Sequence, residues 1–74
     1  MAYQYKVGDI VRINNNACTK IGQIGRIKFY YFRPLLSNRP EYNVEFADRS
    51  CVSYSEYKLD PTTKEEAMLW LLEN

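Results

Sequence analysis

The chain has 74 residues, of which 46% are hydrophobic and 26% are charged, and its formal net charge is +1. This length fits one small domain and excludes separate cofactor and substrate domains. A net charge so close to zero also argues against a polyanion binder that relies on bulk charge. The charge is nevertheless uneven: residues 1–61 carry nine basic and six acidic residues, a balance of +3, whereas residues 62–74 balance to −2.

The first part of the chain predicts a strand followed by a loop. Gly8-Asp9 is typical of a turn or bulge, and residues 11–13 then alternate apolar, basic and apolar, as in a half-buried strand. The asparagine run over residues 14–16 tolerates left-handed backbone and favours local hydrogen bonds, which indicates a loop.

Residues 21–33 predict a long and strongly curved second strand. Gly22 and Gly25 flank Ile24, and a run of β-branched and aromatic residues follows. Gly25 fits a bulge or a tight bend. Strict alternation predicts an inner face made of Ile27, Phe29 and Tyr31 and an outer face made of Arg26, Lys28, Tyr30 and Phe32.

The middle of the chain predicts a loop, two paired strands and a closing turn. Pro34 and Pro40 disfavour a strand interior and predict a connecting loop over residues 34–41, where Leu35 and Leu36 either tuck over the barrel or form an exposed apolar spot. The elements expected next are a strand over residues 42–46, a hairpin turn over 47–50, a return strand over 51–54, a 3₁₀ turn over 55–58 and a short last strand from Leu59 to Asp60-Pro61.

The remaining residues predict a helix over residues 62–73. Thr62 and Glu65 have the spacing of a capping box. The six consecutive apolar residues 67–72 surround such a helix and form no single stripe. Two arrangements are open. In one, Met68, Leu71 and Leu72 cap the end of a barrel and leave Leu69 or Trp70 partly exposed; in the other, Leu69 and Trp70 also pack, through Leu35 and Leu36.

Three stretches resemble the SH3-like barrel superfamily, and together they cover residues 5–60. Residues 7–13, VGDIVRI, resemble the opening strand of such domains. Residues 22–27, GQIGRI, are similar to the G-x-x-G-x-I/V element of KOW and Tudor-like barrels. Residues 42–46, the hairpin and the pattern Tyr54-x-Glu56-x-x-Leu59 resemble the third and fourth strands with the closing 3₁₀ turn.

This resemblance implies a mostly β fold, namely a small five-stranded SH3-like barrel over residues 5–60 with a short C-terminal α-helix, in a single domain over residues 1–74. A looser likeness extends to the small stromal photosystem I subunit and to ferredoxin-docking SH3-like barrels, in which a glycine-punctuated second strand precedes Tyr-x-Val-x-Phe. SH3-like barrels host many unrelated roles, so the resemblance implies the fold more than the function.

The residue types do not favour catalysis. The chain has no histidine, the commonest general base near neutral pH. Two isolated cysteines, Cys18 and Cys51, fall short of a metal-ligand set, and we interpret them as small core or semi-buried residues with free thiols. We therefore expect no enzymatic activity, no metal and no cofactor. The N-terminus has no signal-peptide pattern and residues 67–72 are too few to span a bilayer, so we expect a cytoplasmic protein without membrane attachment.

Two features are candidate binding sites. Basic residues interleaved with aromatic ones on the second strand can hold phosphates while a ring stacks on a base, can dock an acidic protein patch, or can form an ordinary solvated strand face. A tryptophan exposed on the helix is a candidate anchor for a partner or a second copy. The candidate binding residues are Arg26, Lys28, Tyr30, Phe32, Arg33, Arg39 and Trp70.

We expect a non-enzymatic binding module, a protein–protein adaptor or small regulatory subunit whose partner is a protein. The alternative is a KOW-like nucleic-acid-binding module that uses the basic-aromatic strand face. A third hypothesis is a structural protein that associates with itself through the helix, and the expected state is a monomer or a weak homodimer.

Overall fold

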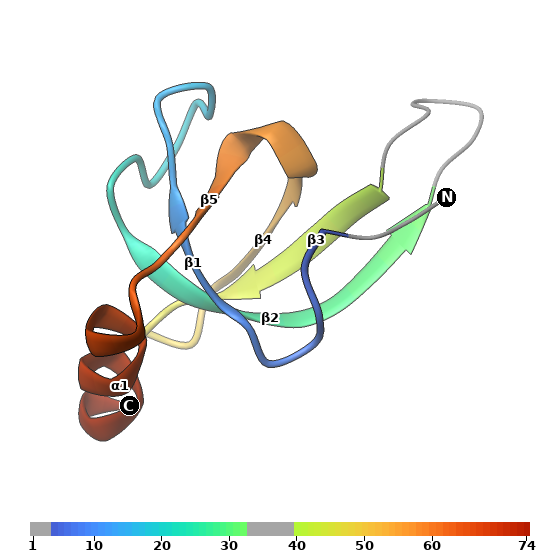
Figure 1. Cartoon of the computed structure of the whole chain (residues 1–74). Helices are drawn as coiled ribbons and strands as arrows, with labels where there is room; N and C mark the ends of the chain where they lie inside the picture. The colour runs from blue at the N-terminus through green and yellow to red at the C-terminus, as the bar shows by residue number, and fades with distance from the viewer. Residues whose placement is uncertain (1–3, 33–39) are drawn as a thin grey trace.

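Five antiparallel strands form one sheet in the computed structural model, which describes residues 4–32 and 40–74 (Figure 1). The strand order is β4-β3-β2-β1-β5, and within the described residues the outermost strands β4 and β5 do not pair, so the sheet is open. The predicted mostly β fold with five strands and a C-terminal helix is confirmed. The elements are β1 (Ile10–Ile13), β2 (Ile24–Phe32), β3 (Pro40–Glu45), β4 (Cys51–Ser55), the 3₁₀ helix η1 (Glu56–Lys58), β5 (Leu59–Pro61) and α1 (Lys64–Glu73).

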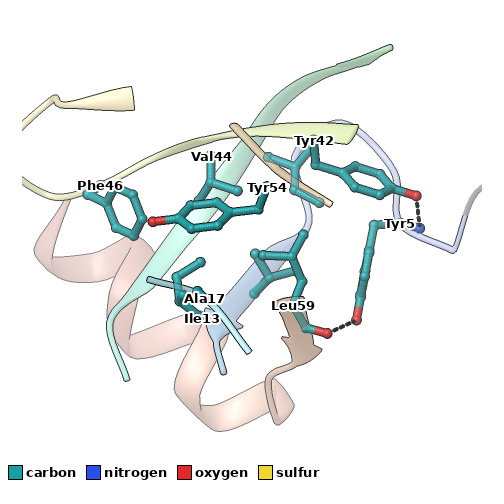
Figure 2. Packing of buried hydrophobic residues seen from close by; sticks show 10 residues of the cluster. Tyr5, Ile13, Ala17, Tyr42, Val44, Phe46, Tyr54 and Leu59 are labelled. Carbon is teal, nitrogen blue, oxygen red and sulfur yellow. Dashed lines mark hydrogen bonds between the residues drawn. The ribbon is translucent and has the colours of Figure 1, made fainter. Parts of the chain in front are cut away.

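The core lies on one face of this curved sheet. Val11, Ile13 and Val44 are fully buried, and Figure 2 shows aromatic rings from β3, β4 and the N-terminal segment closing around the aliphatic residues. Alternation in β3 places every second residue inward, as predicted, but the strand begins at Pro40, inside the predicted loop over residues 34–41. Among the described residues, the buried cluster consists of Tyr5, Val11, Ile13, Ala17, Ile27, Tyr42, Val44, Phe46, Tyr54 and Leu59, with Val52 packed against it.

A bulge at Lys28 overturns the predicted faces of β2. Ile27 pairs with Val44 but Phe29 pairs with Asn43, so Lys28 is the extra residue. Beyond it the alternation is inverted: Phe29, expected in the core, is 50% exposed. Tyr30, expected on the outer face, lies opposite Tyr42, with the two rings edge to face at a centroid distance of 6.0 Å.

The predicted bulge does not lie at Gly25, because the pairing of β1 with β2 runs through this residue without a register shift. Gly25 is buried against the end of β3, and a Cβ atom there would lie 2.6 Å from Cγ1 of Val44 and 2.7 Å from the carbonyl oxygen of Glu45. The glycine is therefore required by the close approach of two strands, and the bulge follows three residues later.

The elements that follow β3 agree with the sequence-based predictions except at the start of the helix. The hairpin turn, η1 and the short β5 lie where they were expected. The capping box, however, is formed by Thr63 and Glu66, one residue later than predicted, because the hydroxyl of Thr62 donates to the carbonyl oxygen of Ile10 at 2.8 Å. The helix accordingly begins at Lys64 rather than at residue 62.

Two further sequence predictions concerned the burial of the cysteines and the position of two leucines in the predicted loop before β3. Cys18 and Cys51 are both free and both exposed, so their interpretation as core or semi-buried residues is wrong. Leu35 and Leu36 lie outside the described residues.

Candidate functional site

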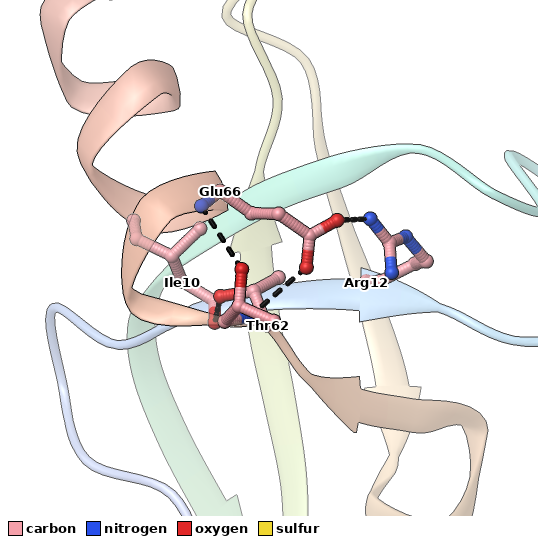
Figure 3. Close-up of polar contacts among 5 residues, drawn as sticks. Ile10, Arg12, Thr62 and Glu66 are labelled. Carbon is pink, nitrogen blue, oxygen red and sulfur yellow. Dashed lines mark hydrogen bonds and ion pairs between the residues drawn. The ribbon is translucent and has the colours of Figure 1, made fainter.

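Two side-chain contacts fasten α1, which lies at one end of the sheet (Figure 1), to strands of that sheet. Glu66 reaches back from the first turn of α1 to Arg12 of β1 (Figure 3). The same carboxylate accepts the Thr63 backbone N–H at 3.0 Å through its other oxygen, so it serves the helix cap and the ion pair together. Farther along, the indole N–H of Trp70 donates to the carbonyl oxygen of Ile24 at 3.0 Å.

The remainder of α1 faces away from the sheet, and none of its residues is fully buried. The side that was expected to cap a barrel is the exposed one, because Trp70 takes the inward position and is half-buried. Trp70 is thus a fastener of the helix more than a freely exposed anchor. The large apolar side chains on the exposed side, here called the α1 surface, are Met68 (54% exposed), Leu69 (59%), Leu71 (51%) and Leu72 (81%).

A groove of about 560 Å³ runs between α1 and the turn that joins β3 to β4. Arg26 in this groove is paired with Glu45 at 3.3 Å. Arg49 from the turn and Glu73 from α1 form no ion pair within the described residues. The groove is lined by Arg26, Glu45, Phe46, Ala47, Arg49, Trp70, Leu72, Glu73 and Asn74.

A second, smaller hollow of about 310 Å³ lies beside the groove, on Ile24, Glu66 and Leu69. Trp70 and Glu73 line both hollows. The α1 surface is therefore bordered by two hollows that the side chains of a partner can enter. No local sequence pattern marks the groove, because its two walls are 20 or more residues apart in the chain.

The predicted basic-aromatic face is only partly assembled. Arg26 and Lys28 do lie together, 44% and 52% exposed at their side chains, but both face the Glu45 carboxylate, at 3.3 and 3.6 Å. One acid thus offsets much of their combined charge. Tyr30 lies on the other side of the sheet beside Tyr42. The Phe32 side chain and the residues Arg33 and Arg39 are outside the described part of the chain.

The bulge creates an outer aromatic pair that the sequence did not reveal. Phe29 and Tyr31 lie on the outer side of β2 with ring centroids 6.1 Å apart. The Tyr31 hydroxyl donates to Glu41 at 3.3 Å. Strict alternation placed both rings in the core, so only a prediction of the bulge at Lys28 could have found this pair.

The groups with shifted pKa values are two tyrosines of the buried cluster and one aspartate of a turn, where their hydrogen bonds stabilise the fold. Burial, followed by its hydrogen bond to Glu56, raises the pKa of Tyr42 to about 12. Burial also raises the pKa of Tyr5, whose hydroxyl donates to the carbonyl oxygen of Leu59. The side-chain hydrogen bond from Ser50 lowers the pKa of the exposed Asp48 in the β3–β4 turn.

Among residues 4–32 and 40–74, no group of three acidic, cysteine or histidine side chains is arranged to hold a metal ion. In the same residues, no helix has the length and apolar character needed to cross a bilayer.

Comparisons with protein-family models, with curated proteins and with solved structures gave no match for this chain.

Proposed function

We propose that this chain is a non-enzymatic protein-binding module, an adaptor or small regulatory subunit built on an SH3-like barrel. The antiparallel order β4-β3-β2-β1-β5, with the 3₁₀ helix η1 between β4 and β5, supports the barrel assignment. Tyr5 links β5 to β3 on the open side of the sheet, because its hydroxyl donates to the Leu59 carbonyl oxygen and its backbone N–H donates to the Tyr42 hydroxyl (Figure 2).

The observation that carries the proposal is the α1 surface. Four large apolar side chains, each more than half exposed, lie together on a helix of ten residues. Clusters of this kind, in contrast to scattered single residues, mark interaction surfaces on small proteins. The helix is also held in place by Arg12 and by the Trp70 indole, so a partner meets a preformed surface and little ordering is required on binding.

Affinity capture with matched variants tests this function. The immobilised chain and two variants are exposed to an extract of the source cells: Leu69→Glu with Leu72→Glu, and the control Ile21→Glu. Ile21 is also 50% exposed but is remote from α1 in sequence and absent from the groove lining. We expect proteins retained by wild type and control to be lost with the α1 double variant. Identical capture by all three would contradict the proposal.

A second candidate function is binding of single-stranded nucleic acid. The specific observation in its favour is the outer pair of Phe29 and Tyr31, beside Arg26 and Lys28, since exposed rings next to basic residues can stack bases and hold phosphates. Glu45 and Glu41 on the same side oppose it. We therefore rank it second.

Titration of labelled single-stranded DNA and RNA at two salt concentrations tests the second function. Binding that weakens steeply with salt and is lost in Phe29→Ala would favour it over protein binding. Absence of binding at about 100 μM, where even non-specific binders register, would exclude it.

A further inference from the structure

The groove beside α1 holds two opposite charges that form no ion pair with any residue in the described ranges 4–32 and 40–74. Arg49 lies on the wall formed by the β3–β4 turn, and Glu73 lies on the wall formed by α1. The other two charged residues of the lining, Arg26 and Glu45, already pair with each other. Within the described residues, the patch therefore offers one cation and one anion that are free to bind an outside group.

Such a patch is complementary to itself. In a two-fold interface, a residue i that contacts residue j of the second copy is matched by residue j contacting i. A two-fold axis that runs along the groove brings the β3–β4 turn of each copy onto α1 of the other. Arg49 then meets Glu73 twice, whereas a patch with charges of one sign would repel its own copy.

The apolar part of the patch and the charge of the whole chain agree with this arrangement. Leu72 borders the groove next to Glu73 and is 81% exposed, so the same contact would remove it from water. The chain carries +3 over residues 1–61 and −2 over residues 62–74, and α1 belongs to the acidic part. An acidic helix and a basic sheet domain in one chain attract each other between copies.

We propose that α1 and the β3–β4 turn form a two-fold interface with a second copy of this chain, closed by reciprocal Arg49–Glu73 ion pairs over Leu72. This rests on the proposed function, because it names the occupant of the α1 surface. A helix of ten residues is only about 15 Å long. Its contact falls below the roughly 800 Å² per partner of a standard interface, so the dimer is weak.

Sedimentation equilibrium from about 10 μM to about 1 mM tests the interface, a range chosen for a weak complex. Wild type is expected to shift from monomer to dimer with concentration. Arg49→Glu and Glu73→Arg, each alone, bring like charges together and should weaken dimerisation about tenfold or more. An equimolar mixture of the two variants restores both ion pairs, and we expect the dimer to return in the mixture.

The double variant Arg49→Glu with Glu73→Arg provides the control for folding, because it keeps the net charge and re-forms both pairs in its own dimer. It should dimerise like wild type. The proposal is overturned by a wild-type chain that stays monomeric throughout, or by failure of both the mixture and the double variant to recover the dimer. A monomer whose α1 surface still captures another protein would remove the second copy as occupant and leave the proposed function intact.

Discussion

The hydroxyl of Tyr42 donates to the Glu56 carboxylate at 2.6 Å and accepts the backbone N–H groups of Gln4 at 3.1 Å and Tyr5 at 3.3 Å. One side chain of β3 thereby joins η1 and the N-terminal segment across the open end of the sheet. The Gln4 N–H also donates to Glu56 at 3.2 Å, whereas the bond from the Tyr5 N–H to the Tyr42 hydroxyl is buried, so removal of the hydroxyl leaves the Tyr5 N–H without this acceptor.

Tyr42→Phe should lower the free energy of unfolding by about 1–3 kcal/mol, the usual cost of leaving buried polar groups unsatisfied. Urea denaturation followed by circular dichroism measures the loss. Tyr57→Phe is the matched control, since Tyr57 is 50% exposed and its removal should change stability little. Equal effects of the two substitutions would show that the Tyr42 hydroxyl does not hold the N-terminal segment.

Alkaline pH should destabilise the fold through the same residue. The pKa of Tyr42 is raised from 10.0 to about 12 in the folded chain. The folded state therefore favours the neutral phenol, and the stabilisation is complete below the unfolded pKa and is lost as pH rises through the folded one. Unfolding free energies measured between these two pH values should fall more steeply for wild type than for Tyr42→Phe. Parallel slopes would contradict this assignment.

Gly25→Ala should lower stability by about 1–3 kcal/mol, as overpacking does. The added methyl group would meet the Glu45 carbonyl oxygen at 2.7 Å, and backbone in a paired strand cannot move aside as a flexible side chain can. Thermal melting measures the effect, with Ser53→Ala on the exposed side of β4 as control. A Gly25→Ala chain as stable as wild type would mean that β2 and β3 separate at little cost.

Glu66 should contribute to α1 in two separable ways. Glu66→Gln keeps an acceptor for the Thr63 N–H and loses the charge opposite Arg12, so we expect about 0.5 kcal/mol from this partly exposed pair. Glu66→Ala removes both and should cost about 1–2 kcal/mol. Trp70 is the only tryptophan in the chain, so its fluorescence reports whether α1 stays docked. Identical fluorescence spectra and identical stabilities for the two variants would show that the helix cap and the ion pair of Glu66 are not separable contributions.

Local signals predicted most of the fold correctly. Pro61 and the threonines that follow it end β5 and begin α1, and the residues of the β3–β4 turn form a hairpin without distant help. The bulge at Lys28 was not predictable by alternation, because it depends on Tyr30 packing against Tyr42 in another strand. The helix start was misplaced by one residue for a similar reason, since the Thr62 hydroxyl is engaged by β1.

The candidate site was harder to predict than the fold. Trp70 was named from the sequence as a candidate partner anchor, but whether its side chain faced the sheet or solvent depended on the distant carbonyl of Ile24. Arg49 and Glu73 share a groove only because α1 folds back beside the β3–β4 turn. Neither residue has a neighbour in sequence that reveals this.

The proline at the end of β5 affects which edge of the sheet can accept an additional strand. Pro61 pairs with Val11 on its inner side and, having no N–H, offers no donor to an incoming strand on its outer side. β5 is also only three residues long, whereas β4 on the opposite border has five residues and no proline. β4 therefore presents the longer row of unpaired backbone donors and acceptors of the two edge strands in the described sheet.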